Sequence, residues 1–191
     1  MKVIAFNGSS RRDGNTAILV RHVFAELQKE GIETEMVSLA GKPLNGCLGC
    51  YKCFINQNRQ CVQIKDSMNS YVEKMIEADG IILASPVYVA SVPAQMKALI
   101  DRGVMVSKAN GNLLRRKVGA AVVAARRGGM MTAFDTLNHF FFISEMIVPG
   151  SSYWNFAMGL EKGDVDKDQE GIQTMHVLGQ NMSWLMKKLY T

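Results

Sequence analysis

Four closely spaced cysteines are the residues best suited to chemistry in this sequence. Cys47, Cys50, Cys53 and Cys61 are all the cysteines of the chain, and they fall within the segment GCLGCYKCFINQNRQC, residues 46–61. Thiols in such a group can pair as disulfides, bind zinc or an iron–sulfur cluster, or run thiol redox chemistry. The spacing is C-x2-C-x2-C-x7-C, with three thiols at equal short gaps and a fourth at the end of the loop.

This spacing favours an iron–sulfur cluster. Zinc sites are commonly built from two separated ligand pairs, whereas three cysteines at two-residue gaps can wrap one side of a [4Fe–4S] cubane, with Cys61 as the fourth ligand. Gly46 and Gly49 add the backbone freedom that a close approach to sulfur requires. The proline that follows the last cysteine in the ferredoxin signature is missing. A zinc site and a loop of reduced thiols stay open as alternatives.

Composition indicates a globular protein, and we expect one domain over residues 1–191. Hydrophobic residues make up 48% of the chain and charged residues 20%, which is typical of a protein with a sizeable core. The N-terminal apolar run is too short for a signal peptide, and no run approaches the ~20 residues of a membrane span. We therefore expect a cytoplasmic protein without a membrane partner, in a compartment where structural disulfides are disfavoured.

The charge pattern argues against nucleic-acid binding. The 22 Lys and Arg residues outnumber the 17 Asp and Glu residues, for a formal net charge of +5. The basic residues are scattered and carry no interleaved aromatics, so we expect no nucleic-acid partner. A modest positive field favours ligands that bear phosphate, or acidic partner proteins.

Short apolar runs alternate with amphipathic stretches along the whole chain. The apolar runs predict strands at 2–6, 34–39, 80–85, 117–125 and 146–151, and the 3.6-residue periodicity predicts helices near 17–27, 66–78, 93–102, 131–145 and 172–189. Such alternation predicts an α/β fold, with a doubly wound, five-stranded parallel sheet and helices on both faces. Two longer loops interrupt the pattern, 40–65 with the cysteines and 151–166, and loops of this length are usually functional.

Polar residues follow the first predicted strand, where open α/β sheets bind their ligands. The loop NGSSRRDGNT, residues 7–16, offers Ser9, Ser10, Arg11, Asn15 and Thr16 just before a helix. The free N–H groups at a helix N-terminus attract phosphate. The loop matches neither the Walker A pattern nor the Gly-x-Gly-x-x-Gly pattern. A phosphate monoester held by neutral donors is one interpretation, and a polar turn that caps the helix is the other.

Two further loops should lie at the same edge of the sheet. SPVYVASVPAQMKALIDR, residues 85–102, begins with residues that can line a flat ring system: Pro86, Val87, Tyr88 and Ser91. After the fourth strand, AARRGGMMT (124–132) contains Gly128 and Gly129, which permit close backbone approach. Arg126 and Arg127 in this stretch are either solvated or balance charge on a ligand.

Residues 1–102 resemble the flavodoxin-like NAD(P)H-dependent FMN reductase family. GSSRRDGNT is similar to that family's phosphate loop, and ASPVYVASVPAQMKALIDR to its isoalloxazine-contacting loop and following helix. The resemblance implies FMN, with its phosphate held by Ser9, Ser10, Arg11, Asn15 and Thr16, and its ring beside Pro86, Val87, Tyr88, Ser91, Gly128 and Gly129. The cysteine motif after the second strand resembles the iron–sulfur flavoprotein branch, which implies a [4Fe–4S] cluster on Cys47, Cys50, Cys53 and Cys61.

The resemblance implies an enzyme, an FMN-dependent oxidoreductase that couples FMN to the cluster. FMN takes up two electrons as hydride, and a [4Fe–4S] cluster carries one at a time, so the pair would convert two-electron into one-electron transfer. The expected donor is NAD(P)H or ferredoxin, and the expected assembly is a homodimer or homotetramer with the cluster near a neighbouring subunit's flavin. We predict no acid–base or nucleophilic catalytic residue. The alternative is an NAD(P)H-dependent FMN or quinone reductase without a cluster.

Overall fold

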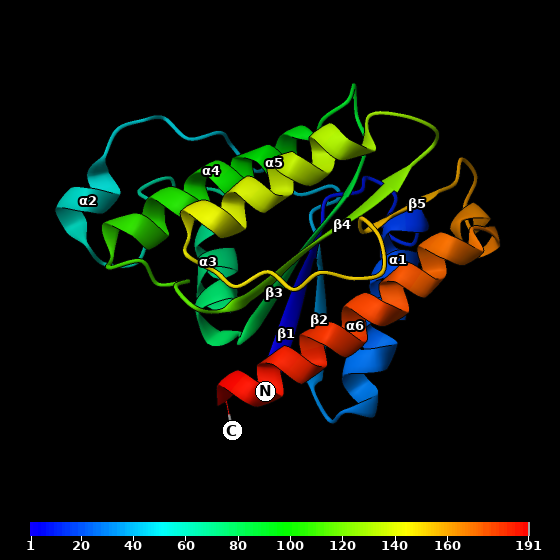
Figure 1. The fold of residues 1–191 in the computed structure, drawn as a ribbon. Coiled ribbons are helices and arrows are strands. Elements are labelled where there is room, and N and C mark those ends of the chain that lie inside the picture. The colour runs from blue at the N-terminus through cyan, green and yellow to red at the C-terminus, as the bar shows by residue number, and fades with distance from the viewer. Residues whose placement is uncertain (191) are drawn as a thin grey trace.

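The structure, a computed structural model, describes residues 1–190 as a twisted parallel sheet between two layers of helices (Figure 1). The strand order is β2-β1-β3-β4-β5, and every neighbouring pair is parallel. This order confirms the predicted flavodoxin-like fold, whose ligands bind where the winding reverses at β1 and β3. The strands are β1 (Lys2–Asn7), β2 (Glu33–Ser38), β3 (Gly80–Pro86), β4 (Val118–Ala125) and β5 (Phe156–Met158).

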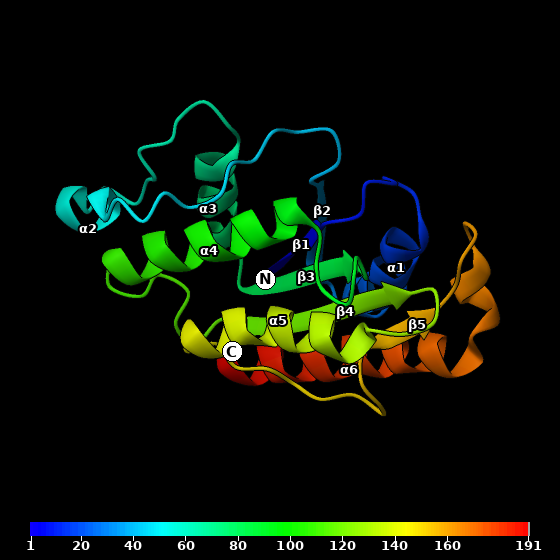
Figure 2. The same cartoon turned by 90° about the horizontal axis from the view of Figure 1, so that it is seen from above.

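Two helices cover one face of the sheet and three cover the other, as Figure 2 shows from above. The first pair is α1 (Asn15–Lys29) and α6 (Gln169–Tyr190), and the opposite layer is α3 (Met68–Glu77), α4 (Ala94–Ala109) and α5 (Met130–Ile143). The short helix α2 (Lys52–Asn56) lies beside α4, away from the sheet (Figures 1 and 2). Among residues 1–190, no helix is both long and apolar enough to cross a membrane.

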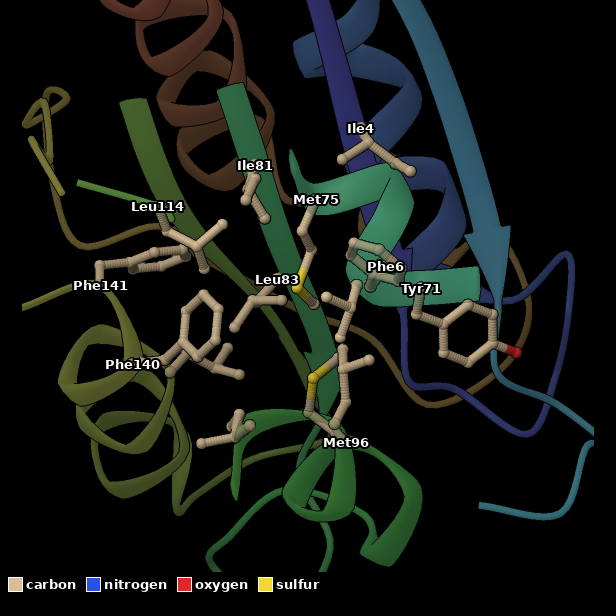
Figure 3. Packing of buried hydrophobic residues seen from close by; sticks show 14 of the residues in the cluster. Ile4, Phe6, Tyr71, Met75, Ile81, Leu83, Met96, Leu114, Phe140 and Phe141 are labelled. Atoms are coloured by element: carbon tan, nitrogen blue, oxygen red, sulfur yellow. The ribbon is translucent and has the colours of Figure 1, made fainter. Parts of the chain in front are cut away.

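Successive side chains along each strand point to opposite faces of the sheet, and this divides the core into two apolar clusters. On β3, Ile81 and Leu83 pack under α3, α4 and α5, while Ile82 and Ala84 pack under α1 and α6. Figure 3 shows the first cluster, in which Met75, Met96, Phe140 and Phe141 meet the strand residues. Such two-sided burial explains why β3 reads as a continuous apolar run.

The predicted fifth strand, 146–151, is wrong. In that segment Ile147 alone forms a parallel bridge, to Val118, and Pro149 and Gly150 follow at once. Proline lacks the N–H that a ladder requires. The edge position is taken by β5, which pairs with Val123–Ala125 and lies inside the predicted loop 151–166.

The two long loops also contain short helices that the apolar pattern did not predict. The segment between β2 and α3, residues 39–67, is called here the cysteine loop, and it contains α2. The segment after β5 contains a single 3-10 turn, Asp164–Lys167. Both are too short to display an amphipathic period, which explains their omission.

Candidate functional site

A cavity of about 240 Å³ lies at the carboxyl ends of β1, β3 and β4, where the fold predicts a ligand site. The predicted residues that line it are Ser9, Arg11, Asn15, Thr16, Pro86, Val87 and Tyr88, and the other lining residues are Gly14, Ala124, Arg126, Gly159 and Leu160. Gly159 and Leu160 follow β5 and were missed because that strand was misplaced. Arg126 is the member of the 126–127 pair that reaches the cavity.

Side chains hold the loop after β1 in shape and leave donors facing the cavity. The Ser9 amide donates to Asn7 Oδ1 at 3.0 Å, and the Arg11 amide donates to Ser9 Oγ at 3.1 Å. Gly14 precedes α1 at its N-cap position and supplies no side-chain cap. The N–H groups in the first turn of α1, near Thr16, therefore have no capping side chain. Such N–H groups suit an anionic ligand.

Asn15 lines the cavity and also contacts the segment after β5. Its Nδ2 donates to the Glu161 carbonyl at 2.9 Å, and its Oδ1 accepts from the Gly163 amide at 2.8 Å. Arg11 Nη1 contacts the Leu160 carbonyl of the same segment at 3.4 Å. Both polar ends of Asn15 are thus engaged, and the residue ties the segment after β5 to the wall of the cavity.

A tight turn follows β3 and carries the aromatic wall. Tyr88 and Ser91 exchange two backbone hydrogen bonds, of 2.8 and 2.9 Å, across Val89 and Ala90. Val89 has φ 48° and Ala90 has φ 55°, a conformation that is unfavourable for residues with a Cβ and for β-branched valine above all. Val89 is fully exposed at the tip. Strain of this kind concentrates at ligand sites.

Gly129 lets a second loop approach this turn. It has φ +81°, and a Cβ on it would lie 2.8 Å from Ala90 Cα and 3.0 Å from Val87 Cγ1. Gly128 has nothing within 4 Å of the equivalent position. Neither glycine lines the cavity, nor does Ser91. Gly129 therefore supports the 88–91 turn from behind, and Ser91 closes it through its backbone.

All four cysteines border one small second cavity, on the outer side of α4. Cys53 is buried and Cys61 half-buried, whereas Cys47 and Cys50 are exposed. The backbone of Cys61 is clamped by Asn69 of α3, which accepts from its N–H at 2.8 Å and donates to its C=O at 3.0 Å. In residues 1–190 no three Cys, His, Asp or Glu side chains converge closely enough to hold a single metal ion.

A buried ion pair closes the base of the cysteine loop. Arg102 and Asp66 have side chains that are 0% and 1% exposed, and Arg102 Nη1 lies 2.5 Å from Asp66 Oδ2. Burial alone would raise the pKa of Asp66, but hydrogen bonds from Arg102 and from two backbone amides lower it below its usual value. Arg102 also borders the cysteine cavity. The sequence places Arg102 at the end of the segment 85–102 and gives no sign of its role, because its partners lie in a distant loop.

The four thiols are chemically suited to a soft metal centre. Burial raises the pKa of the Cys53 thiol above its usual value, and the nearby Cys61 and Cys50 sulfurs raise it further. The thiolate is therefore disfavoured until a cation balances it, as an iron centre would. The donor set thus fits an iron–sulfur cluster.

The two cavities lie apart within one chain. The first is lined by Pro86, Val87 and Tyr88, before α4 begins, and the second by Arg102, Met105 and Val106, in the later half of α4. At a rise of ~1.5 Å per residue, this places the second cavity on the order of 15 Å along the helix from its start. Figure 2 likewise shows α2 far from the carboxyl ends of β3 and β4.

The sequence matches known proteins over most of its length. Residues 1–161 match the model of the NADPH-dependent FMN reductase family. The chain belongs to this family. Two similar relatives are iron–sulfur flavoproteins, one from Methanocaldococcus jannaschii with 42% identity over 98% of each chain, and one from Methanosarcina thermophila with 33% identity over 92% of this chain and 90% of the relative. Within the NADPH-dependent FMN reductase family, the chain therefore belongs with the iron–sulfur flavoproteins.

Solved structures of flavodoxin type share the fold of this family member. A flavodoxin from the domain Archaea superposes with a TM-score of 0.62 at 14% identity, over 98% of this chain and 99% of the other. At that identity the likeness concerns the fold alone. It agrees with the strand order 2-1-3-4-5.

Proposed function

We propose that this protein is an FMN-dependent oxidoreductase that couples FMN to a [4Fe–4S] cluster. The observation that carries the proposal is the presence of two separate, chemically matched sites in one family member. One is a cavity beside an uncapped helix N-terminus, and the other is a cavity bordered by all four cysteines. When bound, FMN would supply two-electron hydride chemistry and the cluster one-electron transfer.

Named residues of the first cavity would hold FMN. Ser9, Arg11 and Thr16, with the first amides of α1, suit the phosphate, and Ser10 supports the site through Tyr88. Pro86, Val87 and Tyr88 suit the flat ring, with Ser91, Gly128 and Gly129 shaping the loops behind it. Asn15 would act by positioning the segment after β5, and Arg126 adds a cation at the cavity wall.

Cys47, Cys50, Cys53 and Cys61 would hold the cluster. Its distance from the flavin cavity of the same chain favours transfer to the flavin of a second copy, and hence a homodimer or homotetramer. The surface of the cysteine loop supports this assembly, because it exposes large apolar side chains around the thiols: Leu48, Tyr51, Phe54, Ile55, Val62 and Ile64. Apolar exposure of this density is typical of an interface.

The electron donor is proposed to be NAD(P)H or ferredoxin, in the cytoplasm and without a membrane or nucleic-acid partner. The positive charge of +5 suits an acidic redox protein or a phosphate-bearing nucleotide. The alternative, an FMN or quinone reductase whose cysteine loop holds no cluster, predicts the same flavin chemistry without iron.

An anaerobic half-reaction tests the proposal. The protein, reconstituted with FMN, iron and sulfide, is mixed with NADPH or with reduced ferredoxin, and the flavin and cluster absorbances are followed separately. We expect both centres to be reduced by at least one donor. In a variant with all four cysteines changed to alanine, the flavin alone should respond. Flavin reduction without any change in a loaded cluster would contradict coupling between the two.

A further inference from the structure

Arg102 is the most completely buried charged residue in the described part of the chain, with 1% of its surface exposed. A buried guanidinium is costly unless its donors are satisfied. Its partners therefore show what the residue is for. All of those partners belong to the cysteine loop.

The terminal nitrogens of Arg102 close this loop at both ends. Nη1 donates to the Asn45 carbonyl at 3.0 Å and to Asp66 Oδ2 at 2.5 Å. Nη2 donates to the Gln63 carbonyl at 3.0 Å and to Asp66 Oδ1 at 3.1 Å. Asn45 and Gln63 flank the cysteines on either side, so one side chain of α4 fixes the two ends of the segment that carries them.

The remaining donor has no partner. Nε of Arg102 is buried and makes no hydrogen bond in the described chain. Arg102 and Cys61 border the same cavity. An orphaned buried donor beside a cavity points to a group that fills the cavity.

We propose that Arg102 is a positioning residue for the cluster, with its terminal nitrogens holding the cysteine loop closed and its Nε donating a hydrogen bond to the Cys61 sulfur or to an adjacent cluster sulfide. This inference rests on the proposed cluster. Hydrogen bonds to cluster sulfurs stabilise the reduced, more electron-rich state and so raise the reduction potential. Arg102 therefore sets the potential of the cluster as well as its place.

Two variants separate this role from a merely structural one. Arg102→Lys keeps the positive charge beside Asp66 but removes Nε. Asp66→Asn disturbs the same ion pair but leaves Nε in place and removes a negative charge. The cluster potential is measured by an anaerobic titration with dithionite, followed by electron paramagnetic resonance. We expect a lower potential in Arg102→Lys, and an unchanged or higher potential in Asp66→Asn, with iron content near that of the wild type in both.

A shift in the same direction in both variants would indicate a loosened loop only and would overturn the inference, as would an unchanged potential in Arg102→Lys. If Arg102→Lys does not take up a cluster, the inference is tested on the wild-type protein. Protein labelled with 15N-arginine should show 15N hyperfine coupling in the spectrum of the reduced cluster, and the absence of coupling would overturn the inference. A wild type that takes up no iron would instead overturn the proposed function, and this inference with it.

Discussion

The hydroxyl groups of Ser10 and Tyr88 lie 2.7 Å apart and join the loop after β1 to the turn after β3. The two residues are 78 positions apart in the chain, and neither loop has another side-chain hydrogen bond to the other among the described residues. This contact links the proposed phosphate region of the cavity to its aromatic wall. This pair of exposed hydroxyls therefore ties two walls of the cavity together.

We expect Tyr88→Phe to weaken FMN binding by roughly 2- to 10-fold, because one hydrogen bond contributes about 0.5–1.5 kcal/mol. The phenyl ring is kept, so the wall itself remains. Titration of the apoprotein with FMN, followed by flavin fluorescence, measures the change. In a Ser10→Ala background the same substitution should have no further effect. A full effect in that background would show that Tyr88 acts independently of Ser10.

Asn15→Leu should free the segment after β5. The substitution removes two hydrogen bonds, to Glu161 and Gly163, for an expected loss of about 1–2 kcal/mol. Hydrogen exchange of residues 159–167 should become faster, and FMN affinity should fall. Asn15→Asp keeps the acceptor for the Gly163 amide and should give an intermediate result. Unchanged exchange in Asn15→Leu would contradict the positioning role.

The adjacent residues Gly128 and Gly129 offer a matched pair of substitutions. Gly129→Ala places a Cβ at φ +81° and 2.8 Å from Ala90 Cα, and both effects together should cost about 1–3 kcal/mol. For a chain of this size, that corresponds to a decrease in Tm of roughly 3–10 °C. Gly128→Ala meets nothing within 4 Å and should behave like the wild type. Equal behaviour of the two variants in thermal unfolding would refute the close approach.

Glu26 should make stability depend on pH. Hydrogen bonds from Lys29, and then from Gln180 and His176, lower its pKa from 4.5 to about 2 although burial opposes this. Because the folded-state pKa is depressed, the stabilisation is complete above pH 4.5 and is lost as the pH falls toward 2. This stabilisation is on the order of 2–3 kcal/mol, which is less than the full pKa shift would give because Lys29 is exposed and its charge is screened by solvent.

Glu26→Gln should accordingly remove most of this acid dependence from urea unfolding curves recorded between pH 5 and pH 2.5. Glu30 provides the control, because it joins the same two helices through an exposed pair with Lys187. Glu30→Gln should leave the acid dependence nearly unchanged. The same loss of acid dependence in both variants would mean that the pH response belongs to the helix pair in general.

Much of the fold was predictable because it depends on local patterns. The run at 80–85 is apolar because β3 is buried on both faces, and the apolar residues of α1 recur at helical spacing. The prediction of the fifth strand was wrong because Met146–Val148 is as apolar as a strand. The actual strand, β5, has only three residues and forms by pairing with β4. Pairing between distant segments leaves no periodic signal.

In the candidate site, too, local sequence patterns predicted one part, and contacts between distant segments determine the other. The cysteines and the first loop were predicted from residue types and spacing, and they border the two cavities. The contacts of Asn15 and Arg102 were not predicted, because the fold alone brings their partners close. Asn15 contacts Glu161 and Gly163. Arg102 contacts both ends of the cysteine loop. A buried arginine in a helix looks like any solvated arginine until its surroundings are known.

Whether one chain holds both a flavin and a cluster is decided by the cofactor content of the anaerobically purified and reconstituted protein. Iron, acid-labile sulfide and FMN are measured per chain, together with the absorption spectrum. We expect about four irons, four sulfides and one FMN per chain. FMN without iron after reconstitution would contradict it and would leave a flavin reductase whose four cysteines serve another purpose.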